Sequence, residues 1–250
     1  MKSLIFISLT LISGAIAGTL FGLINQVVVE PYIDRAVGIQ TQNAINSGQM
    51  IMSTTQQSNY RMWQKGGEIA AGAIYGISLS ALFGVIFAYG RNSTLLPGSN
   101  NTKKALVLAG IMFLVLFLVP TLKYPANPPG VGDPQTIYLR ETLYVGFIAT
   151  SGFTALSLAF MNKKFGDNNS LLSKKNAIIV LPVIYALVMV VAYVSFPPNP
   201  DKITIPMDLI LNFRIAGAFT VGLFWLFLGI ILGSLWDKLK PHQTSKITSV

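Results

Sequence analysis

The sequence predicts an all-α integral membrane protein, a bundle of about six transmembrane helices with proline-rich outer loops. Its 250 residues are 52% hydrophobic and only 11% charged, whereas an ordinary soluble domain is about 25% charged. Six apolar runs are long enough to cross a hydrocarbon core, which takes roughly 20 residues. They lack the strict apolar/polar alternation of a membrane β-strand, so helices are expected. We therefore expect one polytopic membrane domain over residues 1–250.

The first run, residues 4–29, is expected to be an uncleaved helix. Lys2, an apolar stretch and the small residues 15–17 together resemble a signal peptide with its cleavage site. The apolar run continues past that site to Val29, which is too long for a signal-peptide core. The other five helices are expected near residues 69–89, 105–122, 143–161, 177–196 and 213–235.

Small residues recur every four positions along three of these runs. Such spacing lets membrane helices approach closely. We expect them to pack within the chain, with a second copy or a small partner helix as alternatives. The residues are Gly14, Gly18 and Gly22 in the first run, Gly72, Gly76, Ser80, Gly84 and Ala88 in the second, and Gly229 and Gly233 in the sixth.

The distribution of charge predicts the orientation in a cell membrane. Eleven of the 18 Lys and Arg residues fall on the side that holds both termini, and seven fall on the other side. The positive-inside rule then places both termini in the cytoplasm. Two acidic residues lie inside and seven outside, so the inner segments carry the whole net charge of +9. This charge suits anionic membrane lipid and does not call for nucleic acid.

Several kinds of chemistry are excluded by what the sequence lacks. It has no cysteine, and its single histidine, His242, lies in the C-terminal tail. Disulfides, thiolate metal sites and a multi-histidine metal site within the chain are therefore ruled out. The sequence also lacks a Walker phosphate loop, an HExxH pair and a nucleophile elbow. We do not expect an enzyme, and we expect no permanently bound cofactor.

The predicted outer connections contain most of the polar residues that could form a binding site, together with many prolines. The second, KYPANPPGVGDPQTIYLRETLY at residues 123–144, contains four prolines and two glycines. The third, which opens with FPPNPD at residues 196–201, repeats its order of an aromatic residue, proline, an Asn-Pro pair and a later arginine. The first opens with EPYIDR at residues 30–35 and is uncharged and rich in Gln and Asn over residues 36–60. A cap helix is one reading of that segment, whose role the sequence leaves open.

Each polar residue in these connections also has a structural reading. Asp133 before Pro134 suits a helix N-cap, and Asp208 or Glu30 suits a first helical turn. As a set, however, carboxylate and amide oxygens on proline-stiffened loops provide ligands for hard or borderline divalent cations. The residues therefore indicate a polar cation site but do not identify the metal.

Three segments resemble the CbtA family of predicted cobalt transporter subunits. KYPANPPGVGDPQTI, with Arg140 and Tyr144, is similar to the central motif of that family. EPYIDRA at residues 30–36 is similar to the segment after its first helix, and PMDL with Phe213-Arg214 is similar to the segment before its last helix. Length, order and hydrophobic layout agree with the family over essentially the whole chain.

The resemblance implies a multi-pass membrane subunit that transports cobalt(II) for cobalamin synthesis. It also implies a small single-span CbtB-like partner, whose histidine-rich stretch would supply imidazole ligands that this chain lacks. The motif positions that it carries over fall into proposed metal ligands, namely Asp133, Asp34, Glu30, Asn127 and Asp208, and other positions, namely Arg35, Lys123, Arg140 and Arg214.

Two rival functions stay open at this point. In one, the chain is a non-transporting membrane scaffold that binds a small partner subunit through its glycine stripes. In the other, it carries another solute, such as a corrinoid, with the outer arginines contacting anionic groups.

Overall fold

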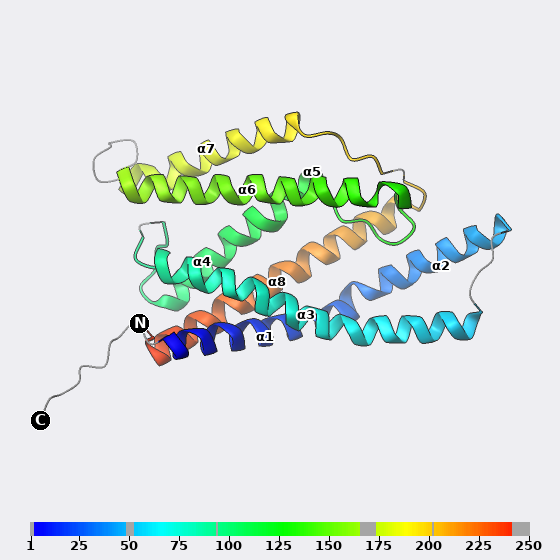
Figure 1. The fold of residues 1–250 in the computed structure, drawn as a ribbon, viewed down its shortest axis with the longest axis horizontal. Coiled ribbons are helices and arrows are strands. Elements are labelled where there is room, and N and C mark those ends of the chain that lie inside the picture. Colours follow the sequence, from blue (N-terminus) through cyan, green and yellow to red (C-terminus); the bar gives the residue numbers. More distant parts are fainter. Residues whose placement is uncertain (1–2, 49–52, 94, 166–173, 202, 242–250) are drawn as a thin grey trace, which may run out of the picture. The chain divides into compact units, whose positions relative to one another are not determined.

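The protein is all-α, as predicted, and is 84% helical (Figure 1). The computed structural model describes residues 3–48, 53–93, 95–165, 174–201 and 203–241, and no strand occurs within them. Six helices among these residues are long and apolar enough to cross a membrane. The prediction of a multi-pass helical membrane protein is therefore confirmed.

The helices follow one another without strands between them in the part of the chain that is described. Their bounds are α1 Ser3–Val28, α2 Glu30–Asn46, α3 Thr54–Gly90, α4 Asn101–Phe113, η1 Leu114–Leu118 (a π-helix), α5 Val119–Lys123, η2 Pro134–Thr136 (a 3₁₀-helix), α6 Ile137–Phe165, α7 Lys174–Ser195 and α8 Met207–Leu239.

Several helices are longer than the apolar runs that predict them. α3, expected from residue 69, begins at Thr54, and α8, expected from residue 213, begins at Met207. With 37 residues, α3 is about 55 Å long at ~1.5 Å per residue, well beyond the roughly 30 Å of a hydrocarbon core. Hydrophobicity marks only the stretch in lipid, whereas the backbone hydrogen bonds continue into polar turns.

The uncharged Gln/Asn-rich segment is largely helical. Its first part belongs to α2, a helix of 17 residues that carries a proline in its first turn, where the missing N–H costs nothing. Residues 54–60 form the first turns of α3. The segment therefore makes a helical extension, while its position outside the membrane stays a prediction.

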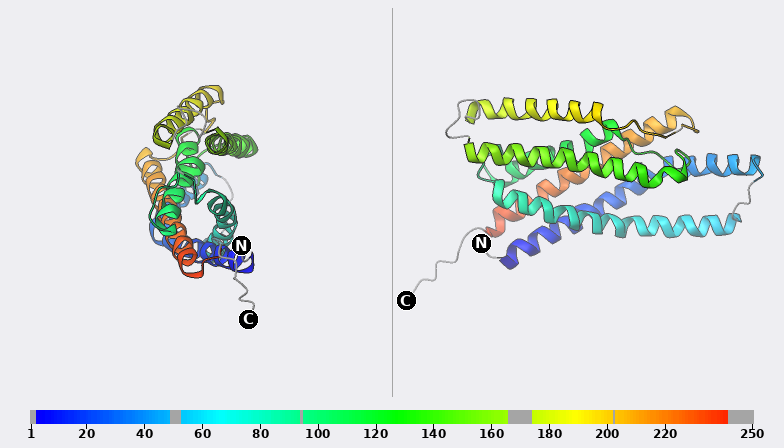
Figure 2. Two further views of the ribbon diagram at one scale, coloured as in Figure 1. Left: turned by 90° about the vertical axis from the view of Figure 1, so that its left-hand side faces the viewer. Right: turned by 45° about the horizontal axis from the view of Figure 1, so that its top comes forward.

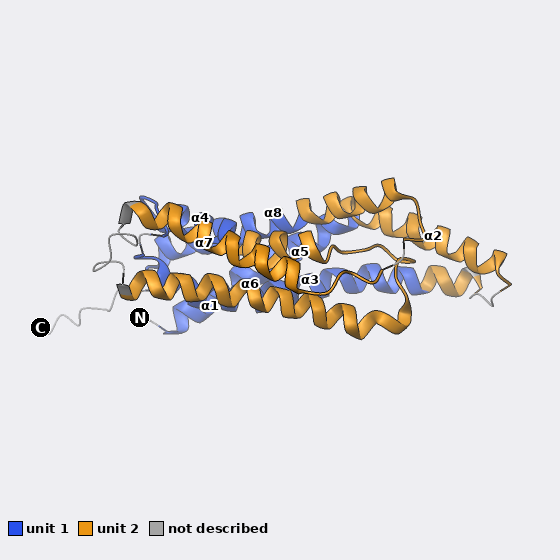
Figure 3. Ribbon diagram, turned by 90° about the horizontal axis from the view of Figure 1, so that it is seen from above, with its two compact units in different colours: residues 1–26, 60–111, 220–250 blue, residues 27–59, 112–219 orange. Residues whose placement is uncertain are grey.

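The chain divides into two compact units (Figure 3). Unit 1 comprises Met1–Gln26, Tyr60–Ile111 and Thr220–Val250, and unit 2 comprises Val27–Asn59 and Met112–Phe219. Unit 1 holds all the small residues of the three stripes, and unit 2 holds the two proline-rich connections.

In unit 1 the glycine stripes of α1 and α3 pack against each other. A Cβ atom on Gly18 would overlap the carbonyl oxygen of Gly72, and one on Gly76 would overlap that of Gly14. The two backbones are therefore in direct contact, which only small residues allow. The prediction that these residues pack within the chain is confirmed for this pair of helices.

The glycines of α8 have the same role against α4 in unit 1. A Cβ atom on Gly233 would lie 2.5 Å from the Cα atom of Thr102, and one on Gly229 would lie 3.0 Å from the Cβ atom of Ala109. These stripes are occupied inside the chain. They cannot then be the docking surface that the scaffold reading requires.

Asp237, near the C-terminal end of α8, caps the N-terminus of α4. One carboxylate oxygen accepts hydrogen bonds from the backbone N–H and side-chain amide of Asn101, and the other accepts from the N–H and hydroxyl of Thr102. The first N–H groups of a helix have no partner within it, so an acceptor there is stabilising. No local pattern predicts this cap, because its two partners lie 135 and 136 residues from Asp237 in the sequence.

We expect Asp237→Asn to lower the free energy of unfolding in detergent micelles by about 1 kcal/mol, because the neutral amide offers one acceptor in place of two. Asp208→Asn, on an exposed first-turn residue of the same helix, is the matched control and should cost less. Equal losses for the two variants would contradict the capping role.

In unit 2, α6 and α7 lie side by side (Figures 1 and 2). Tyr124, Phe147 and Met189 form a buried cluster at one end of this pair, and the ring of Phe147 meets that of Phe196 edge-on at 5.2 Å. This cluster anchors both proline-rich connections, because Tyr124 opens one of them and Phe196 opens the other.

The helical segment before the first of these connections contains a π-helical turn that is followed directly by a proline. Within η1, the N–H of Val119 donates to the carbonyl of Leu114, five residues earlier. The next residue, Pro120, has no N–H. The carbonyl of Val115 therefore loses both the usual i+4 donor and the i+5 donor of a π-helix.

A buried serine satisfies this carbonyl from another helix. The hydroxyl of Ser151 on α6, which is fully buried, donates to the Val115 oxygen at 2.5 Å. Its oxygen also lies 2.6 Å from the hydroxyl of Tyr185 on α7. Because the serine proton is already used, the tyrosine is the donor in that second bond. Three segments of unit 2 are thus joined by one short polar chain.

Candidate functional site

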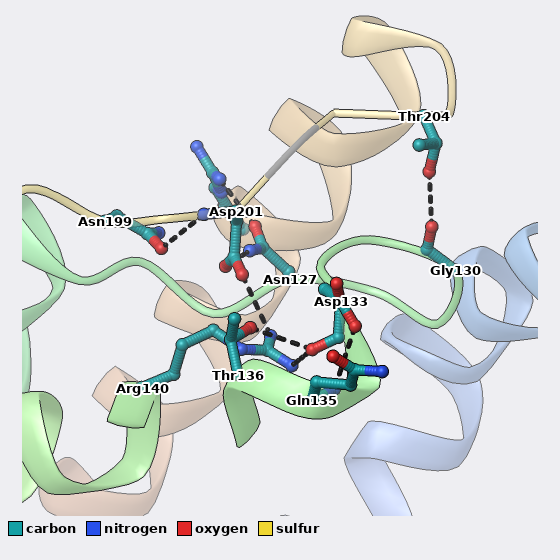
Figure 4. Close-up of polar contacts among 10 residues, drawn as sticks. Asn127, Gly130, Asp133, Gln135, Thr136, Arg140, Asn199, Asp201 and Thr204 are labelled. Carbon is teal, nitrogen blue, oxygen red and sulfur yellow. Dashed lines mark hydrogen bonds and ion pairs between the residues drawn. The ribbon is translucent and has the colours of Figure 1, made fainter. Parts of the chain in front are cut away.

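The two proline-rich connections of unit 2 lie against each other. The hydroxyl of Tyr124 donates to the carbonyl of Pro197 at 2.7 Å, and the hydroxyl of Thr204 donates to the carbonyl of Gly130 (Figure 4). Burial raises the pKa of Tyr124 above its ordinary value, so its hydroxyl stays protonated and remains a donor. Two segments about 70 residues apart in sequence therefore form one structure.

Asp201 is the centre of a polar network between these connections. Its carboxylate pairs with Arg140 at 3.1 Å through one oxygen, and the other oxygen accepts from the side-chain amide of Asn127 at 2.5 Å. Only 7% of the Asp201 side chain is exposed. A carboxylate so well buried must be paired, because its desolvation is otherwise costly.

Arg214, in the second turn of α8, extends the network. Its Nη2 donates to the Asn127 side-chain oxygen at 2.6 Å, and its Nε donates to the carbonyl of Ala126 at 3.1 Å. The amide of Asn127 therefore bridges an arginine and an aspartate, with its oxygen and nitrogen both engaged. The starts of α6 and α8 are joined through this bridge.

Gly132 leaves the space in which the ion pair forms. Its φ of +90° lies in the left-handed region, which disfavours residues with a Cβ atom. A Cβ atom at this position would lie 2.5 Å from the carboxylate oxygen of Asp201 and 2.6 Å from Nη1 of Arg140. The second glycine of the motif is therefore required by both the backbone and the site.

A cavity of about 520 Å³ lies beside the network in unit 2. One wall is the face of α2 that carries Gln40 and Asn43, continued by the C-cap residue Ser47. The opposite walls come from residues 130–134, the first turns of α6, and residues 204 and 205. Arg140 is the charged side chain that lines it.

The family of the chain is shown by its sequence as a whole. A family model described as "Probable cobalt transporter subunit (CbtA)" matches residues 3–237. The chain belongs to the CbtA family. The resemblance found in the three motif segments is thus confirmed. Comparisons with curated proteins and with solved structures found no match.

CbtA membership makes the chain a probable cobalt transporter subunit. The family is one of transporter subunits and not of enzymes. With the helices above, the family also supports a multi-pass membrane protein that works as part of a larger transporter.

Asp133 in the central CbtA motif acts as a helix N-cap, which is the structural reading that the sequence suggested for it. It is the N-cap of η2, and its carboxylate accepts from the N–H of Gln135 at 2.8 Å. Its carbonyl oxygen accepts from Nη2 of Arg140 at 3.3 Å. Since the Asp133 residue is exposed, its carboxylate still faces solvent while its backbone helps to orient the arginine.

The other proposed ligands of the CbtA motifs occupy separate elements. Glu30 is buried and Asp34 is exposed in the first turns of α2, and Asp208 is exposed in the first turn of α8. Within the described ranges, no three His, Cys, Asp or Glu side chains form a group that could hold a metal ion. His242 lies outside those ranges.

The remaining basic motif positions have individual environments. Arg35 is exposed on α2. Lys123, the last residue of α5, places its ammonium 4.5 Å from the ring centroid of Tyr193 on α7, which is a cation–π contact. Arg140 and Arg214 are the two that join the network with Asp201.

Asp201 is the residue that reasoning from the sequence missed. It lies in the FPPNPD segment, which repeats the residue order of the central motif, whereas Asp133 is the proposed ligand because it belongs to the motif that resembles the CbtA family. The similarity between the two connections could have identified Asp201. It aligns the Asn-Pro pair at 127–128 with the one at 199–200, directly before Asp201.

Proposed function

We propose that this chain is the membrane subunit of a cobalt transporter that receives cobalt(II) at the surface formed by its proline-rich connections. It lies in the cell membrane with both termini in the cytoplasm, so that this surface faces outward, and it serves cobalamin synthesis. Family membership supports the cobalt substrate. The excess of Lys and Arg on the other side supports the orientation.

One observation carries the proposed location. The network of Asp201, Asn127 and two arginines ties the 124–133 and 196–206 connections together at the starts of two membrane-spanning helices. If the residues of this network only capped helices, each would contact atoms of its own connection alone. A polar assembly fixed at the mouths of two spans is the arrangement expected where a hydrated ion meets the membrane domain.

The chain would share the metal ligands with a partner. Asp201 is neutralised by arginine, and the described residues contain no group of three His, Cys, Asp or Glu residues suited to a metal ion. Cobalt(II) is well served by imidazole as well as by oxygen. We propose that a small single-span subunit with a histidine-rich stretch completes the ligand set, while Asp133 and Asp34 supply exposed carboxylates.

The test is uptake of labelled cobalt into vesicles that contain the purified chain, with and without this partner. Wild type with the partner is expected to take up cobalt, and Asp133→Asn or Asp34→Asn is expected to slow the initial rate by about tenfold, the effect of losing roughly 1.4 kcal/mol of cation binding. Glu141→Gln is the matched control, because Glu141 is exposed on α6 outside the proposed set.

Two outcomes would count against different parts of the proposal. Uptake equal to that of empty vesicles in every combination would overturn cobalt transport by this chain. Normal uptake in both aspartate variants would retain the transporter and reject the proposed collecting surface.

A further inference from the structure

The cavity beside the Arg140–Asp201 pair has the dimensions of a small-molecule site. Its volume of about 520 Å³ falls within the roughly 300–1,000 Å³ of ligand pockets. Figure 4 shows part of its lining, with Thr204 bonded to Gly130 on one side and Arg140 beside Asp201 and Asp133 on the other. The Thr204–Gly130 hydrogen bond and the positive φ of Gly130 fix the shape of this wall.

The wall formed by α2 is polar and uncharged. Gln40 and Asn43 on one face of the helix line the cavity with its C-cap residue, Ser47, and with the small Ala44 between them. The carboxamides of Gln40 and Asn43 can both donate and accept hydrogen bonds. The Ser47 hydroxyl donates to the carbonyl of Asn43 at 2.8 Å, so it can accept a further bond. This face gives a function to the Gln/Asn-rich segment, which the cobalt proposal leaves unexplained.

The one charged side chain in the lining is a guanidinium with a fixed orientation. Arg140 is held through Nη1 by the Asp201 carboxylate at 3.1 Å and through Nη2 by the Asp133 carbonyl at 3.3 Å. Neither aspartate is part of the lining. Its remaining N–H groups can donate to a carboxylate or another planar anion, whereas a guanidinium, which has no acceptor atom, cannot ligate a metal cation.

The remaining wall is apolar and suits a carbon skeleton. Val131, Ile137 and Ile205 contribute to it. An inorganic ion would leave these side chains without contacts. We propose that the cavity binds a small organic carboxylate that carries hydroxyl groups, with its carboxylate toward Arg140 and its polar oxygens toward the amides of α2.

Such a ligand would have a direct connection to transport. Hydroxy-carboxylates chelate divalent cations through their oxygens, so the cavity would accept cobalt as an anionic complex in place of the free ion. This consequence rests on the proposed function, whereas the binding of the carboxylate does not and can be measured without metal.

The experiment uses the purified full chain in detergent micelles at neutral pH, with citrate as the probe in isothermal titration calorimetry. The uncharged trimethyl ester of citrate is the ligand control. Gln40→Glu, which places a carboxylate in the lining, is expected to weaken citrate binding about tenfold or more through like-charge repulsion. Gln42→Glu makes the same chemical change on the same helix at an exposed position outside the lining, and should bind citrate as wild type does.

Arg140→Gln should abolish binding, but it also breaks the ion pair with Asp201, so the test depends on the two glutamine variants. No citrate binding to the wild type would overturn the inference. Equal binding of citrate and its ester, or equal binding by Gln40→Glu and Gln42→Glu, would also overturn it.

A second arm separates this inference from the proposed function. Citrate binding without any cobalt uptake would reject the transporter and keep the anion site. Cobalt uptake without citrate binding would do the reverse.

Discussion

Gly132→Ala is expected to destabilise the protein by about 2–4 kcal/mol. Roughly 1–2 kcal/mol comes from placing a Cβ atom on a residue in the left-handed region, here at a φ of +90°. The rest comes from overlap with Asp201 and Arg140, whose paired atoms lie 2.5 and 2.6 Å from that Cβ position. The measurement is the free energy of unfolding in detergent micelles.

Gly38→Ala provides the matched control for this substitution. Gly38 is exposed within α2, and a Cβ atom there would have no neighbour within 4 Å. Because alanine is the better helix former, this variant should be more stable than wild type by about 0.5–1 kcal/mol. A Gly132→Ala variant as stable as Gly38→Ala would show that the ion pair does not need the space above the glycine.

Ser151→Ala is expected to cost about 1–3 kcal/mol, the penalty of leaving a buried acceptor without a donor. The acceptor is the Val115 carbonyl, which the π-helical turn and Pro120 deprive of backbone partners. Tyr185→Phe leaves the Ser151–Val115 bond in place and removes only the bond from the tyrosine. Its loss should therefore be smaller than that of Ser151→Ala, as measured by unfolding in micelles.

A double-mutant cycle with Pro120→Ala tests the physical cause. Alanine restores an N–H at position 120, which can donate to the Val115 carbonyl five residues earlier. In this background Ser151→Ala should cost clearly less than it does beside Pro120, so the two substitutions should not be additive. The same cost in both backgrounds would mean that the serine does not compensate for the proline.

The number and type of membrane-spanning helices could be predicted because the bilayer imposes them. A helix must remain apolar for about 20 residues to cross the hydrocarbon, and that requirement is local in sequence. The ends of the helices were less predictable. Thr54–Glu68 of α3 and most of α2 are polar, so hydrophobicity could not reveal them, and their helical state depends on capping and packing.

The polar site was predicted in part, and the division has a physical reason. The order of residues in two connections indicated that they are related. Arg214 does contact Asn127, and Arg140 joins them through Asp201. Local patterns could not indicate that the carboxylate of Asp201, and not that of Asp133, forms the ion pair with Arg140. That pairing depends on how two connections that lie far apart in sequence fold onto each other, and Asp133 already has a local use as an N-cap.

The sequence by itself determined the membrane class, the six helices and the family of this protein. Each follows from a signal contained in consecutive residues: apolar length, or a motif such as YPANPPGVGDP. Only the tertiary structure decided which carboxylate is buried, which carbonyl the π-helical turn leaves to Ser151, and which α2 residues line a cavity with Arg140. These depend on contacts between distant segments, because the burial and pairing of a polar group are set by its neighbours in space.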